Sequence, residues 1–127
     1  MDLESKAGQI ELSRNVKRLL LEVGVNPAEK GFNYLDDAIH ITVEDEEAGC
    51  GKKARQLMGL YEDVAALYGD TTAIRVERCI RHAIEKAFDK RTAKLESIFE
   101  RLEDENSGKV TNGCFIHTLA QYLLIQE

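Results

Sequence analysis

An arginine-rich segment at residues 71–92 carries the side chains of this sequence that are best suited to recognising a ligand. In a helix, at about 100° per residue, its polar side chains fall on one arc of about 140°. These residues are Arg75, Arg78, Arg81, His82, Glu85 and Lys86. A guanidinium group binds guanine O6 and N7 through two hydrogen bonds, and each such contact supplies ~1–3 kcal/mol of discrimination between bases. The pattern is therefore compatible with recognition of duplex DNA through the major groove.

The formal charge of the chain is distributed unevenly about this segment. The 127 residues have a net charge of −6, yet residues 71–92 hold six basic and three acidic side chains. The segment therefore has a charge of +3, and the rest of the chain has a charge of −9. Residues 31–50 contain six acids and no base. We expect an anionic partner to approach residues 71–92.

Glu77 is an acidic residue among these bases. A carboxylate accepts a hydrogen bond from cytosine N4 and repels a wrong base, so Glu77 fits a sequence-reading surface better than a purely electrostatic one. The alternative interpretation is a solvated helix face. Its charges would then pair at i,i+4, as Arg78 does with His82. The charge pattern alone slightly favours the solvated face.

The elements that position this segment are predicted to be helices. The sequence has one proline, Pro27, and its apolar residues recur at intervals of three and four almost throughout. A first helix is expected to end at Gly24. Asn26 is the expected N-cap of a second helix, with Glu29 completing a capping box, and residues 44–51 should form the loop that follows. The sequence predicts an all-α chain of six helices.

A helix-turn-helix is predicted at about residues 57–89. The third helix should bury an apolar stripe and end at Gly69, because glycine permits the positive φ of a tight turn. The stripe is Leu57, Leu60, Tyr61, Val64, Leu67 and Tyr68. Thr71 or Thr72 should cap the fourth helix, at about residues 72–89, which is the helix that enters the major groove in this motif.

Two more helices are expected after this motif, the last of them capped by Thr111 or Asn112. The apolar positions of the fifth helix are Leu95, Ile98, Phe99 and Leu102. Residues 1–127 are long enough for one domain with its own core, and residues 1–9 are expected to be flexible. No apolar stretch is long enough for a membrane crossing, and no secretory signal precedes the helices, so a cytoplasmic location is expected.

Four stretches of the sequence closely resemble one family of bacterial regulators. They are Gly31–Ile39, Leu60–Ala65, Thr71–Glu85 and Thr111–Ile116. The family is the C-terminal DNA-binding domain of the sporulation initiation master response regulators, and the resemblance extends from about Leu12 to Leu123. Those regulators also carry an N-terminal receiver domain, for which 127 residues leave no room. The sequence therefore resembles the effector domain alone, as a stand-alone relative or an excised piece.

The resemblance implies a six-helix domain that regulates transcription by binding a TG-x-CGAA-type box. It also implies binding as a homodimer or tandem copies, and contact with an RNA polymerase sigma subunit. The positions that match DNA-contacting residues of the family are Arg75, Glu77, Arg78, Arg81 and His82. Phosphate contacts would come from Thr71, Thr72 and Lys86, with Lys90 as a further candidate. The turn before Thr72 is one residue longer than in the family, and Ile74 replaces a small polar residue.

Other functions receive less support from the sequence. Cys79 with His82, and Cys114 with His117, have a spacing that two converging helices could use for zinc, but we interpret both cysteines as small hydrophobic residues. Residues 49–53 lack the spacing of a phosphate-binding loop. We therefore expect no enzyme activity, no metal and no cofactor. The alternative function is a protein-interaction module that uses this fold to bind a regulator or a polymerase subunit.

Overall fold

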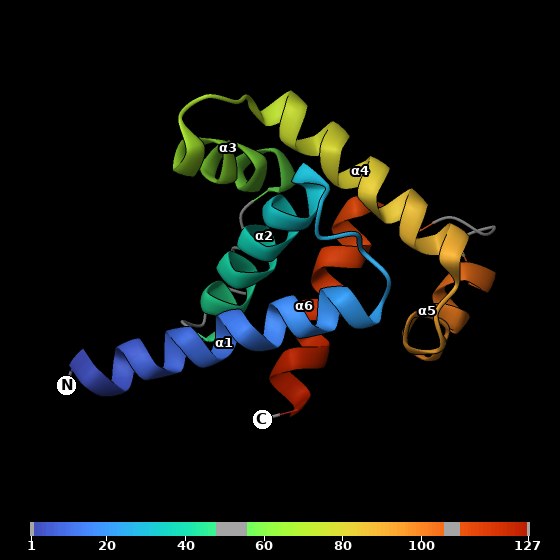
Figure 1. Ribbon diagram of the computed structural model, residues 1–127, viewed down its shortest axis with the longest axis horizontal. Coiled ribbons are helices and arrows are strands. Elements are labelled where there is room, and N and C mark those ends of the chain that lie inside the picture. Colours follow the sequence, from blue (N-terminus) through green and yellow to red (C-terminus); the bar gives the residue numbers. More distant parts are fainter. Residues whose placement is uncertain (1, 48–55, 106–109, 127) are drawn as a thin grey trace.

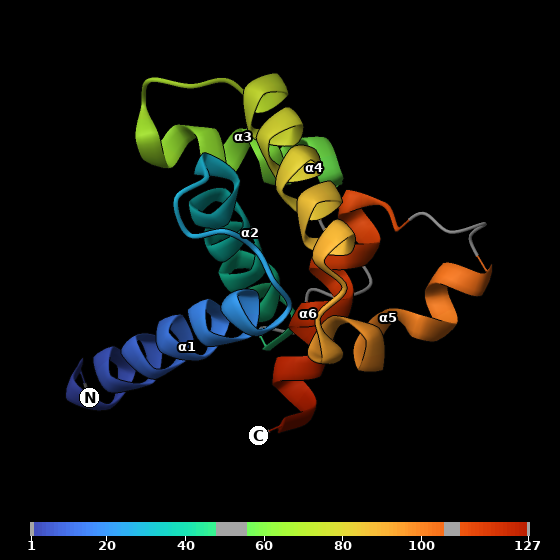
Figure 2. The same cartoon turned by 45° about the vertical axis from the view of Figure 1, so that its right-hand side comes forward.

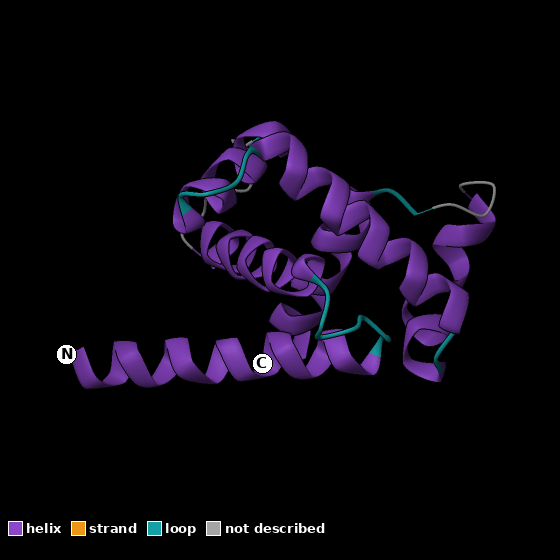
Figure 3. Ribbon diagram, turned by 45° about the horizontal axis from the view of Figure 1, so that its top comes forward, coloured by secondary structure: helices purple, strands orange, loops and turns teal. Residues whose placement is uncertain are grey.

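The computed structural model describes residues 2–47, 56–105 and 110–126, and all of their regular structure is helical (Figures 1 and 3). The helices are α1 (Asp2–Glu22), α2 (Lys30–Glu47), α3 (Leu57–Tyr68), α4 (Ala73–Lys90), α5 (Ala93–Glu105) and α6 (Asn112–Gln126). The described residues contain no strand. The predicted all-α fold of six helices is therefore confirmed.

The turn between α3 and α4 has the cap geometry that the sequence predicted. Gly69 has a φ of 79°, and its N–H donates to the Ala65 carbonyl at 3.1 Å. Thr72 is extended, and its Oγ1 accepts a hydrogen bond from the Arg75 N–H at 3.2 Å. This N-cap satisfies a backbone donor at the start of α4. Both helices therefore begin and end within a residue of the expected positions.

The start of α2 differs from the prediction, because Asn26 stabilises a turn instead of capping the helix. Asn26 Oδ1 accepts from the Ala28 N–H at 2.9 Å, which is a side-chain-stabilised turn. Glu29 forms no capping box, because its carboxylate pairs with Lys86 at 2.7 Å. The helix begins one residue after Glu29.

The acidic end of α2 also differs from the prediction. The loop was expected at residues 44–51, but the helix continues to Glu47. His40 Nε2 lies 3.5 Å from Glu44 Oε2, a side-chain contact at i,i+4 within this last part of the helix. The remainder of the expected loop lies outside the described residues.

Helix α1 is longer than the sequence suggested. It begins at Asp2, so residues 2–9, which were expected to be flexible, are helical. No proline interrupts this stretch, and its N-terminal end extends past the other helices (Figures 1 and 3). The C-terminal half of α1 packs on α2 and α6 and contributes Val16, Leu19 and Leu20 to the core.

The core lies where α2, α4 and α6 meet, and α3 packs beside the N-terminal half of α4 (Figures 1 and 2). Aromatic residues fill the part of the core beside the C-terminal half of α4. The rings of Phe99 and Phe115 are stacked at 5.1 Å between centroids and 4° between planes, and neither residue is exposed. Phe88 of α4 meets Phe99 edge-on at 5.6 Å. This cluster fixes the C-terminal half of α4 against α5 and α6.

Helices α2 and α4 approach each other most closely at Gly31. A Cβ atom at this position would lie 2.4 Å from the carbonyl oxygen of Cys79 and 2.7 Å from the Cβ of Ala83. Only a residue without a side chain fits between the two backbones. Gly31 therefore sets the position of α4 relative to α2.

The apolar stripe predicted for α3 is buried only in part. Leu60, Tyr61 and Val64 are buried, whereas Leu57 and Tyr68 are about 40% exposed and Leu67 is 65% exposed. The prediction was wrong for these three residues, because α2 and α4 cover only one side of α3. On α4 the buried residues are Val76, Ile80, Ala83, Ile84 and Ala87, as expected. The side chain of Leu102 lies outside the described residues.

Candidate nucleic-acid interface

The predicted DNA-reading residues lie on the face of α4 that is turned away from the core. Packing of the apolar face leaves the polar face at the surface of the molecule (Figure 2). The exposed basic residues on this face are Arg75, Arg78, Arg81, His82 and Lys86, and the acidic Glu85 is exposed beside them. The structure therefore brings together these five residues on one cylinder, as a recognition helix requires.

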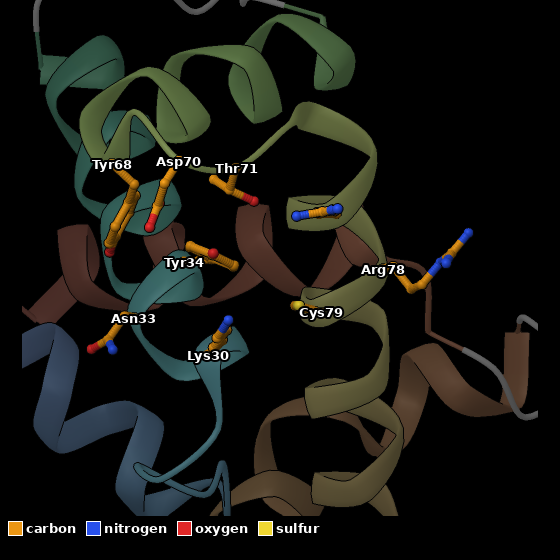
Figure 4. A pocket seen from close by; sticks show the side chains of 9 residues that line it. Lys30, Asn33, Tyr34, Tyr68, Asp70, Thr71, Arg78 and Cys79 are labelled. Carbon is orange, nitrogen blue, oxygen red and sulfur yellow. The ribbon is translucent and has the colours of Figure 1, made fainter.

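Arg75 and Arg78 are free of ion pairs with any residue that the structure describes. Both side chains are exposed. Figure 4 shows that Arg78 projects outward from α4, away from α2. Two guanidinium groups near the start of α4 thus keep their donors available for a ligand.

Arg81 forms a weak, solvent-exposed ion pair with Glu77. Its Nη1 lies 3.6 Å from Glu77 Oε2, and its side chain is half exposed. An i,i+4 pair of this kind contributes only about 0.2–0.5 kcal/mol. Arg81 can therefore exchange Glu77 for a ligand at little cost.

Glu77 lies on the flank of α4 that faces the start of α6. The Asn112 amide donates to the Tyr61 hydroxyl at 3.1 Å and to the Glu77 carbonyl at 3.2 Å, and it lies 3.5 Å from Glu77 Oε2. Asn112 thus joins α3, α4 and α6. Thr111, not Asn112, caps α6, because its Oγ1 accepts from the Cys114 N–H at 3.1 Å. Sequence reasoning missed this bridging role, because the partners are 35 and 51 positions away.

Lys86 is paired within the protein. Its Nζ donates to Glu29 Oε1 at 2.7 Å, which connects the exposed face of α4 to the turn before α2. The hydrogen bond from Lys86, followed by its charge, holds the pKa of Glu29 below its usual range. A phosphate contact by Lys86 requires the exchange of this carboxylate for the phosphate.

A pocket of 280 Å³ lies between the start of α2 and the start of α4 (Figure 4). It is lined by Lys30, Asn33, Tyr34, Tyr68, Asp70, Thr71, Arg75, Arg78 and Cys79. Thr71 is half-buried in this lining, whereas Thr72 is exposed and caps α4. Figure 4 shows the Lys30 side chain directed into the pocket. Lys30 was not predicted as part of the site, because 41 positions separate it from Thr71 in the sequence.

Tyr68 connects the end of α3 to α2. Its hydroxyl donates to Asp37 Oδ2 at 2.5 Å, and its ring meets Tyr34 edge-on at 5.1 Å. Burial, followed by the hydrogen bond to Asp37, raises the pKa of Tyr68 above its usual value. Burial also raises the pKa of Asp37, and the Tyr68 hydroxyl opposes this by stabilising the charged carboxylate. The two residues hold the end of α3, next to the turn of the helix-turn-helix, against α2.

Replacing Tyr68 by phenylalanine should raise the pKa of Asp37 further. The change removes the donor that favours the ionised carboxylate and leaves the burial that disfavours it. Carbon-detected NMR titration of the Asp37 carboxyl group measures this shift. Tyr122→Phe on α6 is the control and should leave Asp37 unchanged. A lowered pKa of Asp37 in the Tyr68→Phe variant would contradict the assigned hydrogen bond.

The cysteines of the described residues show no metal-binding arrangement. Cys79 and Cys114 are free thiols. Cys114 Sγ lies 3.8 Å from the Thr118 hydroxyl, and no group of three or more His, Cys, Asp or Glu side chains in the described part of the chain is placed to hold an ion. Cys50 and residues 49–53 lie outside the described residues.

One family model matches this chain, and it covers residues 16–123 of the 127. The match includes α2, α3, α4 and α5 in full, together with the C-terminal end of α1 and most of α6. None of the helices, as far as they are described, is long and apolar enough to cross a bilayer. The family is one of DNA-binding effector domains of a sporulation regulator, and it is regulatory rather than enzymatic. The chain belongs to the family described as "Sporulation initiation factor Spo0A C terminal".

Proposed function

We propose that this protein is a sequence-specific DNA-binding transcriptional regulator that inserts α4 into the major groove. The observation that carries the proposal is the pair of exposed guanidinium groups, Arg75 and Arg78, which project from the start of a helix whose opposite face is packed in the core. The N-terminal residues of a recognition helix are those that reach base edges. Family membership supports DNA as the ligand.

The exposed residues of α4 divide into base-reading and backbone-binding groups. Arg75 and Arg78 read guanine, and Arg81 and His82 contact either a base or a phosphate. Glu77 accepts from cytosine N4 through the carboxylate that Asn112 holds beside α6. Thr71, Thr72 and Lys86 bind phosphates, and these contacts position the helix without reading sequence. Residues 1–127 act as one helix-turn-helix domain, with the motif at about 57–89.

Arg78→Ala should weaken binding to the specific site by ~1–3 kcal/mol and binding to random duplex much less, because a bidentate base contact is made only to the correct base. The specific site comes first from unbiased selection of duplex sequences by the wild-type protein. Fluorescence anisotropy with the selected site and a scrambled duplex then measures both affinities. Arg14→Ala on α1 is the matched control, since it removes the same charged group from an exposed position on another helix.

Equal losses on both duplexes would make Arg78 a phosphate contact. Titration of the wild-type protein at two salt concentrations tests the function itself, because each neutralised phosphate steepens the fall of affinity with salt. A protein that selects no sequence and shows no salt-dependent duplex binding would instead be an interaction module. The stoichiometry of the complex with a selected site tests binding as a homodimer or tandem copies, and a sigma subunit added to that complex tests the polymerase contact.

A further inference from the structure

A continuous groove runs beside α4, along its junction with the start of α2. The pocket of 280 Å³ forms one part of it, and a second pocket of 370 Å³ continues it toward His82. The second pocket is lined by Ala28, Glu29, Lys30, Gly31, Arg78, Cys79 and His82. Lys30, Arg78 and Cys79 line both pockets. Lys30 therefore stands at the middle of the groove.

The charges that line this groove favour an anion. Lys30, Arg75 and Arg78 contribute positive charge, and Lys30, like the two arginines, pairs with no carboxylate in the described part of the chain. The acidic residues of the lining are Asp70 and Glu29. Glu29 is already neutralised by Lys86. Of the charges that remain in the lining, Asp70 is therefore outnumbered by the three cationic side chains.

The close packing of α2 on α4 fixes where the backbone of Lys30 lies relative to α4. Gly31 places the start of α2 directly against α4, so the neighbouring Lys30 is held at a fixed distance from the recognition helix. Figure 4 shows Lys30 directed into the pocket. Two sugar-phosphate strands border a helix that lies in a major groove, and the Lys30 side of α4 faces one of them.

We propose that Lys30 binds a backbone phosphate of the DNA strand that runs beside α4, with Thr71 completing the phosphate site between α2 and α4. This inference rests on the proposed function, and it adds a residue from outside the helix-turn-helix to the DNA interface. The contact anchors the duplex to α2 and thereby fixes how α4 enters the groove. It carries no sequence information.

Lys30→Gln should weaken binding to the selected site and to a scrambled duplex by the same factor, about eightfold at 0.1 M salt, and should lower the salt slope by about 0.9. Arg18→Gln on α1 removes an equal charge from an exposed position on a helix that packs on α2 and α6, and it should leave the slope unchanged. Thermal unfolding of each variant, followed by circular dichroism, establishes that the fold is retained.

A direct contact is distinguished from a long-range charge effect by replacing single phosphates of the duplex with neutral methylphosphonates. One position should weaken wild-type binding about as much as Lys30→Gln does and have no further effect on that variant. The proposal is overturned if every position weakens both proteins equally, or if the affinity of the variant equals that of the wild type. Failure of the wild-type protein to bind duplex in a salt-dependent way would instead overturn the proposed function.

Discussion

Gly31→Ala should lower the free energy of unfolding by about 1–3 kcal/mol, the usual cost of overpacking a tight contact. The added methyl group would lie 2.4 Å from the Cys79 carbonyl oxygen and 2.7 Å from the Ala83 Cβ, so α2 and α4 must separate. The higher helix propensity of alanine offsets only part of this cost. Urea denaturation followed by circular dichroism measures the change. Specific DNA binding should weaken as well, because α4 carries the arginines that we propose to read bases.

Gly59→Ala in α3 is the matched control for this variant. A Cβ atom at Gly59 meets no atom within 4 Å, so alanine should leave the stability unchanged or raise it by roughly 0.5–1 kcal/mol. Equal stability of the two variants would show that the close approach of α2 and α4 at Gly31 is absent in solution.

Phe115→Ala should have a still larger effect on stability, about 3–5 kcal/mol, because truncation of a buried phenylalanine leaves a cavity. Phe115 is fully buried, stacks on Phe99 and meets Phe88 edge-on at 6.3 Å. The loss should appear as a lower urea midpoint. Ile125→Ala on the same helix is the control, since Ile125 is 80% exposed and should change stability by less than about 0.5 kcal/mol. A Phe115→Ala variant as stable as Ile125→Ala would contradict the stacked core.

The sequence predicted most of the fold because local signals determine it. Periodic apolar residues located the helices, and Gly69 and Thr72 marked the turn between α3 and α4 through φ and cap chemistry. The prediction failed at the start of α2. The Asn26 side chain can either cap a helix or stabilise a turn, and the sequence alone does not show which of the two is preferred. It also failed for Leu67, because the burial of an apolar residue depends on which helix covers it.

The sequence predicted only those site residues that lie together on one helix, α4. Spacing along α4 placed Arg75, Arg78 and His82 on a common face, because helical geometry is regular. Side chains from other helices were missed, as with Lys30 beside Thr71 and Asn112 beside Glu77. These partners are joined by tertiary packing over dozens of positions, and no periodicity encodes such pairs.

The salt bridge of Lys86 with Glu29 has a consequence for the counterions of DNA binding. When Lys86 turns to a phosphate, the DNA releases a condensed cation, but Glu29 loses its partner and attracts a cation from solution. This substitution cancels most of the ion release at that contact. In the proposed DNA complex Lys86 therefore adds little to the dependence of affinity on ionic strength, and a count of the ions released on binding would underestimate the number of phosphates contacted.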